Sequence, residues 1–317
     1  TMKEGMEFQL KYEDTDGFEI HGSTNYQYVY MNEMWPGQIE YDQSLVRSVN
    51  IDIEVDSENG FPDPEDALAP ITAITMKYQD TFFVFGCGDF DSSKYPNVEY
   101  EKCFDEEDLI RQFLDVWNKI DPDVVTGWNI QFFDIPYLVN RITRVCSEQT
   151  ARRLSPWYKI TSKVVTSHGR AQTIFDLIGV SILDYLEMYK NFTQNKRESY
   201  RLDYIAHVEL KEKKLDYSEY QTLHKLYQEN YQKFIEYNIK DVKLVDGLDN
   251  QLKMIEMVLA IAYDAKVNYR DVFAQVRLWD TIIHNYLIDR NIAVPPKKYQ
   301  NKFSQYAGAY VKTPQTG

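Results

Sequence analysis

Asp52 and Glu54 are the first residues of this sequence whose types and spacing could do chemistry. They alternate with apolar residues in "NIDIEVD", residues 50–56, and this alternation predicts a β-strand with one buried face and one acidic face. Side chains two positions apart on a strand point to the same side, so both carboxylates could bind one divalent cation. A solvent-facing acidic strand explains the same pattern, and taken alone the pair favours this simpler interpretation.

Three more residues extend the candidate set. Asp134 ends the run "GWNIQFFD", just before a predicted helix, where an aspartate is also a good N-cap. Tyr237 and Asp241 stand four residues apart in another predicted helix and share one face, as they would in any amphipathic helix. Together with Asp52 and Glu54, these acids could form a two-metal site, which holds ions about 3.5–4 Å apart for phosphoryl transfer. Tyr237 could then orient the attacking water.

The rest of the composition limits the kind of metal site. The three cysteines form no Cys-x-x-Cys pair and the five histidines form no His-x-x-x-His pair. An oxygen-lined site therefore remains, and it favours Mg²⁺ or Mn²⁺ over Zn²⁺. The formal charge of −14 argues against a cationic protein that coats nucleic acid, but not against an enzyme that meets phosphate through bound cations. No apolar run approaches the roughly 20 residues that span a bilayer, so we expect a soluble protein without a membrane partner.

A mixed α/β architecture is expected to position these side chains. The expected elements are strands at 47–55, 71–78, 81–87 and 123–129, a loop at 57–70, helices at 104–122 and 134–146, a hairpin at 158–178 turning at His168–Gly169, a further strand before residue 185, and helices from about 199 onward. Asp105 is the expected N-cap of the first helix, and Pro122 closes its far end. Residues 1–49 carry short alternating runs such as "YQYVYM" and predict a small β-rich module. The helical pattern at 224–266 is too long for one helix, so we expect a break at Gly247.

The motifs around these acids resemble a known family. "DIE", "NIQFFD" and "YNIKD" are similar, in type and order, to the three exonuclease motifs of family B DNA polymerases, D-x-E, N-x₂₋₃-F/Y-D and Y-x₃-D. The sequence around and between them resembles the replicative polymerases of T-even-type bacteriophages, in "NGFPDP", "TGWNIQFFDIPYLVNRI", "RLSP", "GVSILDY" and "GAYVKTP". The resemblance extends over roughly residues 20–317. Motifs in this order and spacing are far more specific than an isolated D-x-E.

This resemblance implies a ribonuclease-H-like exonuclease domain at residues 50–253, an α/β fold in which helices flank a mixed β-sheet. It also implies a smaller, discontinuous N-terminal α+β domain formed by 1–49 and 254–300, with 301–317 as the start of a linker toward a polymerase domain. The family's polymerase motifs, D-x-x-S-L-Y-P-S and Y-G-D-T-D-S, do not occur in the sequence. We therefore expect the palm, fingers and thumb to be absent from this chain.

The resemblance implies removal of mispaired 3′ nucleotides by a proofreading exonuclease that uses two Mg²⁺ or Mn²⁺ ions. Carried over by position, Asp52, Glu54 and Asp241 would ligate the more tightly held ion. Asp52 would bridge to the second ion, which Asp134 would support, in part through water. Tyr237 would position the nucleophilic water.

Substrate contacts are implied in the same way. Phe61 stands where similar polymerases place an aromatic ring against the terminal bases, and base stacking is how many proteins grip single strands. Asn129 would orient the substrate, Phe133 would contact it, and the 158–178 hairpin would help part primer from template. A loop aromatic packed onto the core and a plain surface hairpin are the alternatives.

The resemblance also implies partners and a location. The partners are the 3′ end of single-stranded DNA, primer–template DNA, a polymerase domain of the same protein, and a sliding clamp reached through a C-terminal region outside this sequence. The location is the cytoplasm of a bacterial host. Two other functions remain open: an exonuclease-like fold that binds nucleic acid without metals, and an interaction domain whose acids are surface features. The presence of all four acids argues against the metal-free fold.

Overall fold

The computed structural model describes residues 1–23, 25–58, 60–167 and 170–295. The chain divides into two compact units, one made of Thr1–Gly37 together with the chain from Trp279 onward, and the other of Gln38–Leu278. The expected boundaries of a discontinuous N-terminal domain, between 49 and 50 and between 253 and 254, stay a prediction.

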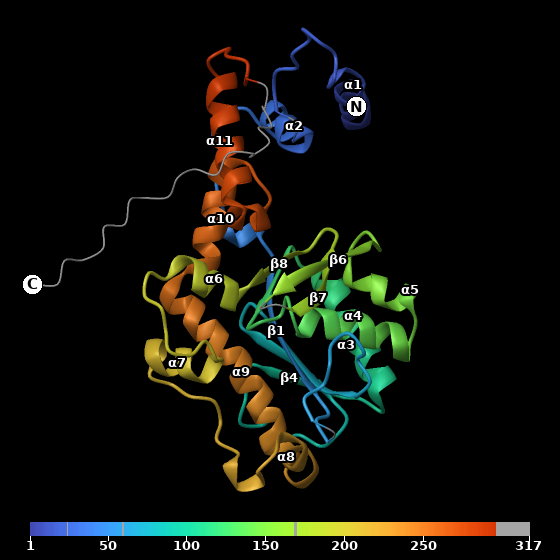
Figure 1. Cartoon of the computed structure of the whole chain (residues 1–317). Helices are drawn as coiled ribbons and strands as arrows, with labels where there is room; N and C mark the ends of the chain where they lie inside the picture. The colour runs from blue at the N-terminus through green and yellow to red at the C-terminus, as the bar shows by residue number, and fades with distance from the viewer. Residues whose placement is uncertain (24, 59, 168–169, 296–317) are drawn as a thin grey trace, which may run out of the picture. The chain divides into compact units, whose positions relative to one another are not determined.

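A six-stranded mixed sheet forms the centre of the larger unit (Figure 1). In spatial order its strands are β4 (Val98–Lys102), β3 (Thr81–Gly86), β2 (Ile71–Tyr78), β1 (Ser48–Val55), β5 (Val124–Gly127) and β8 (Ser181–Asp184). Strand β2 runs antiparallel to both of its neighbours, and the other neighbouring pairs are parallel. Strand β1 therefore lies inside the sheet, with a partner on each side.

Strand β1 also separates the two helical layers. Its apolar side chains, Ile51 and Ile53 among them, belong to a core with helices α3 (Glu106–Ile120) and α4 (Asp134–Val145). Its acidic side chains lie on the opposite face, where helix α9 (Tyr231–Leu252) contacts β1 and β2. This mixed sheet with helices on both faces confirms the predicted ribonuclease-H-like α/β class.

The remaining elements connect or flank these layers. In the larger unit they are η1 (Gln43–Leu45), α5 (Glu148–Ala151), η2 (Arg152–Leu154), β6 (Ile160–Ser167), β7 (Arg170–Leu177), α6 (Tyr185–Phe192), α7 (Leu202–Leu210), η3 (Ser218–Tyr220), α8 (Leu223–Glu229), α10 (Met254–Ala265) and η4 (Tyr269–Phe273). Helices α1 (Met2–Tyr12) and α2 (Tyr26–Met34) belong to the smaller unit, and α11 (Gln275–Ile288) begins in the larger unit and ends in the smaller one. Among the residues that the structure describes, no helix has both the length and the apolar character needed to cross a bilayer.

Local sequence signals set several boundaries as predicted. Helix α3 begins after Asp105, whose side chain accepts a hydrogen bond from the Asp108 backbone N–H at 2.9 Å, and it ends shortly before Pro122. Strands β6 and β7 form the predicted antiparallel hairpin. The predicted turn of this hairpin, at residues 168–169, lies outside the described residues.

The prediction of a β-rich module at residues 1–49 is wrong for the part of that segment that the structure describes. The run "YQYVYM" lies in helix α2, and the first strand begins at Ser48. Six alternating residues are too few to separate a strand from a helix, and packing between helices decides here. The Tyr26 hydroxyl of α2 donates to the Gly5 carbonyl oxygen of α1 at 3.1 Å.

The predicted helix break at Gly247 is also wrong. Helix α9 continues through this residue, and the break falls at Lys253, whose left-handed φ of 53° separates α9 from α10. Gly247 instead allows α9 to pack closely against α7, because a Cβ at this position would lie 3.0 Å from Leu210 Cδ1. A glycine inside a helix lowers its stability by only about 1 kcal/mol relative to alanine, which the surrounding packing can offset.

Candidate active site

Strand β1 and helix α9 bring three of the predicted site residues together. Asp52 and Glu54 project from one face of β1, and Asp241 projects from α9 toward them. Carboxylate oxygens of the three residues lie within 4.8 Å of one another. Asn50, on the same strand, donates from Nδ2 to the Val242 carbonyl oxygen at 2.9 Å and ties the helix to the strand. Residues far apart in the sequence thereby form one acidic cluster.

Asp134 lies beside this cluster. It is the first residue of α4, and the cap position before it belongs to Phe133, whose side chain makes no capping hydrogen bond. The buried Asp134 carboxylate instead accepts a hydrogen bond from the Ile53 backbone N–H at 3.1 Å, at a point between Asp52 and Glu54. The N-cap interpretation is therefore wrong, because Asp134 is the first residue of α4 and not the cap before it, and its carboxylate accepts from the backbone of β1 as well as from its own backbone N–H.

Tyr237 contacts a lysine that was not among the predicted site residues. The Tyr237 hydroxyl oxygen accepts a hydrogen bond from Lys214 Nζ at 3.1 Å, and the same ammonium group forms a salt bridge with Asp241. Lys214 lies in the connection between α7 and η3, where its backbone N–H donates to Asp203 Oδ1 at 2.8 Å. It belongs to the basic run "KEKK", and because such a run ordinarily indicates a solvated loop, no local pattern pointed to this contact.

Asn238 is a second residue of the site that sequence reasoning missed. Its Nδ2 donates to Asp52 Oδ2 at 2.7 Å, and its Oδ1 accepts from the Thr75 hydroxyl at 2.5 Å. Thr75 is paired with Asp52 across β2 and β1, so the three residues form a closed network that fixes the Asp52 carboxylate. The available signal was spacing: Asn238 stands three residues before Asp241, on the same side of α9.

Burial and mutual repulsion disfavour the charged forms of these carboxylates. Burial, followed by the charge of Asp241, raises the pKa of Glu54 to about 8, and burial raises the pKa of Asp134 to about 7. Burial and then repulsion from Asp241 and Glu54 hold the pKa of Asp52 well above its ordinary value. Burial raises the pKa of Asp241, and Lys214 partly counteracts it. Burial opposes the charge of Lys214, but Asp241 outweighs it, so the pKa of Lys214 is raised and the amine stays protonated.

The donor set of the cluster fits divalent cations. Asp241 Oδ1 is buried and has no hydrogen-bond partner among the described residues, which leaves an acceptor free within the cluster. Carboxylate oxygens are the ligands that Mg²⁺ and Mn²⁺ prefer. The charge of such an ion would also offset the repulsion that raises the pKa values of the acids. The cluster can therefore hold divalent metal.

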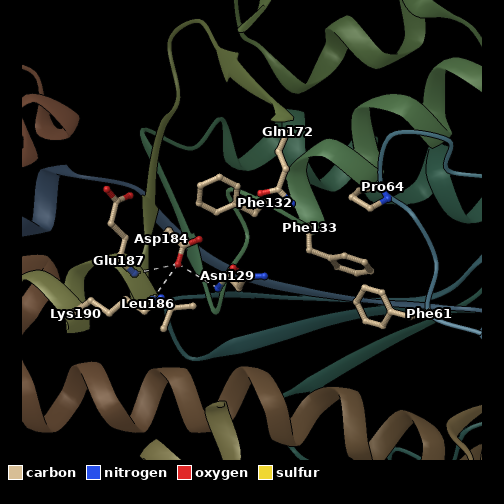
Figure 2. A pocket seen from close by; sticks show the side chains of 10 residues that line it. All are labelled: Phe61, Pro64, Asn129, Phe132, Phe133, Gln172, Asp184, Leu186, Glu187 and Lys190. Carbon is tan, nitrogen blue, oxygen red and sulfur yellow. Dashed lines mark hydrogen bonds between the residues drawn. The ribbon is translucent and has the colours of Figure 1, made fainter. Parts of the chain in front are cut away.

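A cavity of about 410 Å³ contains the predicted substrate-binding residues in its wall (Figure 2). The residues that line it are Phe61, Pro64, Asn129, Phe132, Phe133, Gln172, Asp184, Leu186, Glu187 and Lys190. Phe61 is 88% exposed, and its ring packs on that of Phe133 with the centroids 5.3 Å apart. The alternative of a loop aromatic packed onto the core is therefore wrong, because most of the Phe61 ring is open to solvent.

Asp184 fixes one wall of this cavity. Its carboxylate accepts hydrogen bonds from the backbone N–H groups of Asn129 at 3.1 Å, Gln131 at 2.9 Å and Leu186 at 2.9 Å, and Figure 2 shows the first and the last of these. Burial raises the pKa of Asp184 to about 6, although the backbone hydrogen bonds lower it. Asn129 has a left-handed backbone with φ 66°. Asp184 stabilises this conformation, and the sequence did not single it out.

Carboxylates gathered between an inner strand of an α/β sheet and a helix are typical of the metal-dependent nuclease class, and so is a cavity walled by aromatic rings. None of the four acids lines this cavity, but Phe133, the residue before Asp134, does. The model of the DNA polymerase family B exonuclease domain matches residues 34–205. The chain therefore belongs to DNA polymerase family B and contains the exonuclease domain of that family. This confirms the resemblance in the sequence motifs.

Relatives agree with this assignment. The chain is 35% identical to the DNA-directed DNA polymerase of Escherichia phage RB69, over 99% of this chain and 37% of the relative. It is 32% identical to the DNA-directed DNA polymerase of Enterobacteria phage T4, over the same shares of 99% and 37%. It is 26% identical to the DNA polymerase delta catalytic subunit of Dictyostelium discoideum, over 88% of this chain and 28% of the relative. The chain thus spans 37% of the length of the two phage relatives.

Proposed function

We propose that this chain is the proofreading 3′→5′ exonuclease portion of a DNA-directed DNA polymerase, and that it hydrolyses the 3′-terminal phosphodiester of single-stranded DNA. Family membership supports this proposal. The observation that carries it is the cluster of Asp52, Glu54 and Asp241, in which carboxylate oxygens from two distant segments lie within 4.8 Å of one another. Buried charges of like sign are unfavourable unless a partner neutralises them, and a cation does so.

We further propose two Mg²⁺ or Mn²⁺ ions as cofactors. Asp52, Glu54 and Asp241 would hold the first ion, and Asp52 would also reach the second, with Asp134 in support. Asp241 Oδ1, which is buried without a partner among the described residues, would complete the ligand set. When bound, two such ions activate a water and stabilise charge on the attacking and leaving oxygens.

Tyr237 and Lys214 would act on the attacking water from the protein side. Burial and the charge of Asp241 raise the pKa of Tyr237, so its hydroxyl stays protonated and can orient a water but does not accept a proton from it. Lys214 Nζ donates to the oxygen of this hydroxyl at 3.1 Å, and the hydroxyl itself donates toward the Asp241 carboxylate, so both residues fix the position of the hydroxyl that would contact the water. The Lys214 ammonium also places one positive charge beside the carboxylates. This charge would stabilise the negative charge on a scissile phosphate.

The cavity would receive the unpaired strand. Phe61 and Phe133 present ring faces on which bases can stack, and such stacking binds single strands without reading their sequence. Asn129, which lines the same cavity, would orient the strand, and Lys190 can neutralise a backbone phosphate.

We propose further partners, with membership of the family as their support. Primer–template DNA, a polymerase domain of the same protein and a sliding clamp are the proposed partners. The β6–β7 hairpin is proposed to help part primer from template, and the host cytoplasm is the proposed location. Each of these proposals depends on the exonuclease function.

A hydrolysis assay tests the proposed function. A 5′-labelled single-stranded oligonucleotide should be shortened from its 3′ end, with release of mononucleotides, when Mg²⁺ or Mn²⁺ is present. The double variant Asp52→Ala, Glu54→Ala removes two proposed ligands, so we expect its activity to fall at least about a thousandfold, since several kcal/mol of charge stabilisation are lost. Circular dichroism should show that the variant remains folded. The double variant Glu99→Ala, Glu101→Ala is the matched control, because these acids have the same spacing on β4 but are exposed.

Undiminished cleavage by the double variant at β1 would contradict the assignment of the site. A folded chain that neither cleaves DNA nor binds Mn²⁺ in a calorimetric titration would favour a metal-free nucleic-acid-binding module or an interaction domain. Tight binding of duplex DNA without metal would also count against the exonuclease proposal.

A further inference from the structure

Helix α4 holds the loop that carries Phe61. Four of its side chains donate hydrogen bonds to five main-chain carbonyl oxygens of residues 64–69. The pairs are Tyr137 Oη to Ala69 at 2.6 Å, Asn140 Nδ2 to Pro64 at 2.8 Å, Arg141 Nη1 to Ala67 at 3.1 Å and to Leu68 at 2.6 Å, and Arg144 Nη2 to Asp66 at 2.9 Å. The four donors follow the i, i+3, i+4, i+7 spacing of one helical face, which we term the clamp face.

The clamp face is itself fixed to its surroundings. Arg141 forms a two-pronged salt bridge with Glu106 of α3, from Nε to Oε1 at 2.7 Å and from Nη2 to Oε2 at 2.6 Å. Glu106 Oε1 also accepts the Ile71 backbone N–H at 2.7 Å, where the loop enters β2. A planar guanidinium bound in this way has little freedom to rotate. The two helices and the end of the loop are therefore held as one body.

Phe61 and its partner ring both depend on this helix. Phe133 immediately precedes α4, and Phe61 stands shortly before the clamped residues 64–69. The two rings lie side by side in the wall of the cavity, with centroids 5.3 Å apart (Figure 2). Because Phe61 is largely exposed, core packing does little to hold its ring. The anchors of its loop must therefore define where the ring lies.

We propose that the clamp face positions Phe61 for stacking on the bases of an unpaired strand, and that it thereby sets how tightly the exonuclease site holds its substrate. The proposal rests on the exonuclease function proposed above. The four donors are positioning residues, because they act through the loop and not on the reacting atoms. A weakened clamp should therefore loosen substrate binding and leave the chemical step at saturating substrate unchanged.

The variant Arg144→Ala tests the clamp with little risk to the fold, because this side chain is exposed and the salt bridge of Arg141 stays intact. We expect the KM for single-stranded DNA to rise about three- to tenfold, the loss typical of one hydrogen bond, with kcat unchanged. Arg144→Lys keeps a donor and should recover part of the KM. Asn140→Ala, which removes a different donor, should raise the KM in the same way.

Arg152→Ala is the matched control. Arg152 is an exposed arginine in the segment that follows α4, and it forms a salt bridge with Glu148 at 2.7 Å. It donates to no residue of the Phe61 loop in the hydrogen bonds of the described residues. Its removal should leave both the KM and kcat unchanged.

A double-variant cycle separates positioning of Phe61 from a general loosening of the fold. In a Phe61→Ala background, Arg144→Ala should add little to the KM, since its effect passes through the missing ring. Three results would overturn the proposal: an equal rise of the KM in both backgrounds, an unchanged KM in both Arg144→Ala and Asn140→Ala, or a fall in kcat with the KM unchanged.

Quenching of a 2-aminopurine base at the 3′ end of the strand gives a readout that does not need hydrolysis. The base should be quenched on binding to the wild-type chain and less so on binding to Arg144→Ala. A chain that binds and quenches but never cleaves would contradict the proposed function, while loss of quenching in the variants would still support the clamp. A chain that neither binds nor cleaves would overturn both.

Discussion

At the scale of single residues, Lys214 contributes charge to the site without being a metal ligand. In Lys214→Met, the donor to Tyr237 and the cation beside Asp241 are both lost. Hydrogen bonds to charged groups contribute about 1.5–3 kcal/mol, so we expect kcat on single-stranded DNA to fall about 10- to 100-fold. Affinity for Mn²⁺, measured by calorimetry, should not fall, because a neighbouring positive charge opposes the binding of a cation.

Lys211→Met is the control for this prediction. Lys211 belongs to the same basic run, and its Nζ donates to the Val208 carbonyl oxygen at the surface. Both kcat and Mn²⁺ affinity should be unchanged in this variant. If Lys214→Met lost its Mn²⁺ binding together with its activity, Lys214 would be required for the shape of the site, and the separation of charge from coordination would be wrong.

The same residues show what the sequence can predict of the site. The acids Asp52, Glu54 and Asp241 stand in short motifs whose spacing alone places them on one strand face or one helix face. Lys214 reaches Asp241 only because the connection after α7 folds against α9. Asn238 becomes a site residue only because α9 crosses β1. Contacts of this kind depend on packing between distant segments, which no local pattern contains.

At the scale of elements, Gly127 controls the fit of β5 against β1. A Cβ at this position would lie 2.4 Å from the Ile51 carbonyl oxygen and 2.5 Å from Ile130 Cγ2. Because the first contact is backbone, Gly127→Ala must move the strand just before Asp52. We expect this variant to lose about 1–3 kcal/mol of unfolding free energy, as overpacked interiors do, and to bind Mn²⁺ more weakly. Urea unfolding and a calorimetric titration measure the two effects.

Gly247→Ala is the matched comparison within α9. A Cβ there would meet the flexible end of Leu210 at 3.0 Å, and the helix would gain from alanine. Its unfolding free energy should change by less than about 1 kcal/mol, and its Mn²⁺ affinity should not change. Equal effects of the two substitutions would show that backbone crowding at Gly127 does not matter.

The limits of a helix could be predicted from the sequence wherever a single residue caps or terminates it. Asp105 and Pro122 bound α3 through capping and the missing amide hydrogen, so its limits follow from local chemistry. The alternating run at 26–31 favours a strand, but it forms a helix because it packs on α1. Gly247 does not break α9, because α7 packs closely against it. Predictions failed at the positions where tertiary contacts outweigh local preference.

At the scale of the whole molecule, we expect the acidic cluster to make the stability of the fold depend on pH and on divalent metal. Burial raises the pKa of Glu54 to about 8 and that of Asp134 to about 7, whereas unfolded chains titrate near 4. The folded state therefore binds protons more strongly than the unfolded state. The stabilising effect of these protons is complete below about pH 4 and is lost as the pH rises through 7 and 8. Lys214 does not reverse this trend, because its raised pKa keeps it charged throughout.

We therefore expect the metal-free protein to unfold at a lower temperature at pH 8 than at pH 5.5. Thermal unfolding in EDTA at the two pH values measures the effect. Mg²⁺ or Mn²⁺ should restore stability at pH 8, because an ion that binds the folded state favours it by mass action. Glu54→Gln removes one of the titrating groups and should reduce the dependence on pH, whereas the exposed control Glu101→Gln should not. An unfolding temperature that rises from pH 5.5 to pH 8 in EDTA would show that the buried carboxylates do not dominate the stability of this molecule.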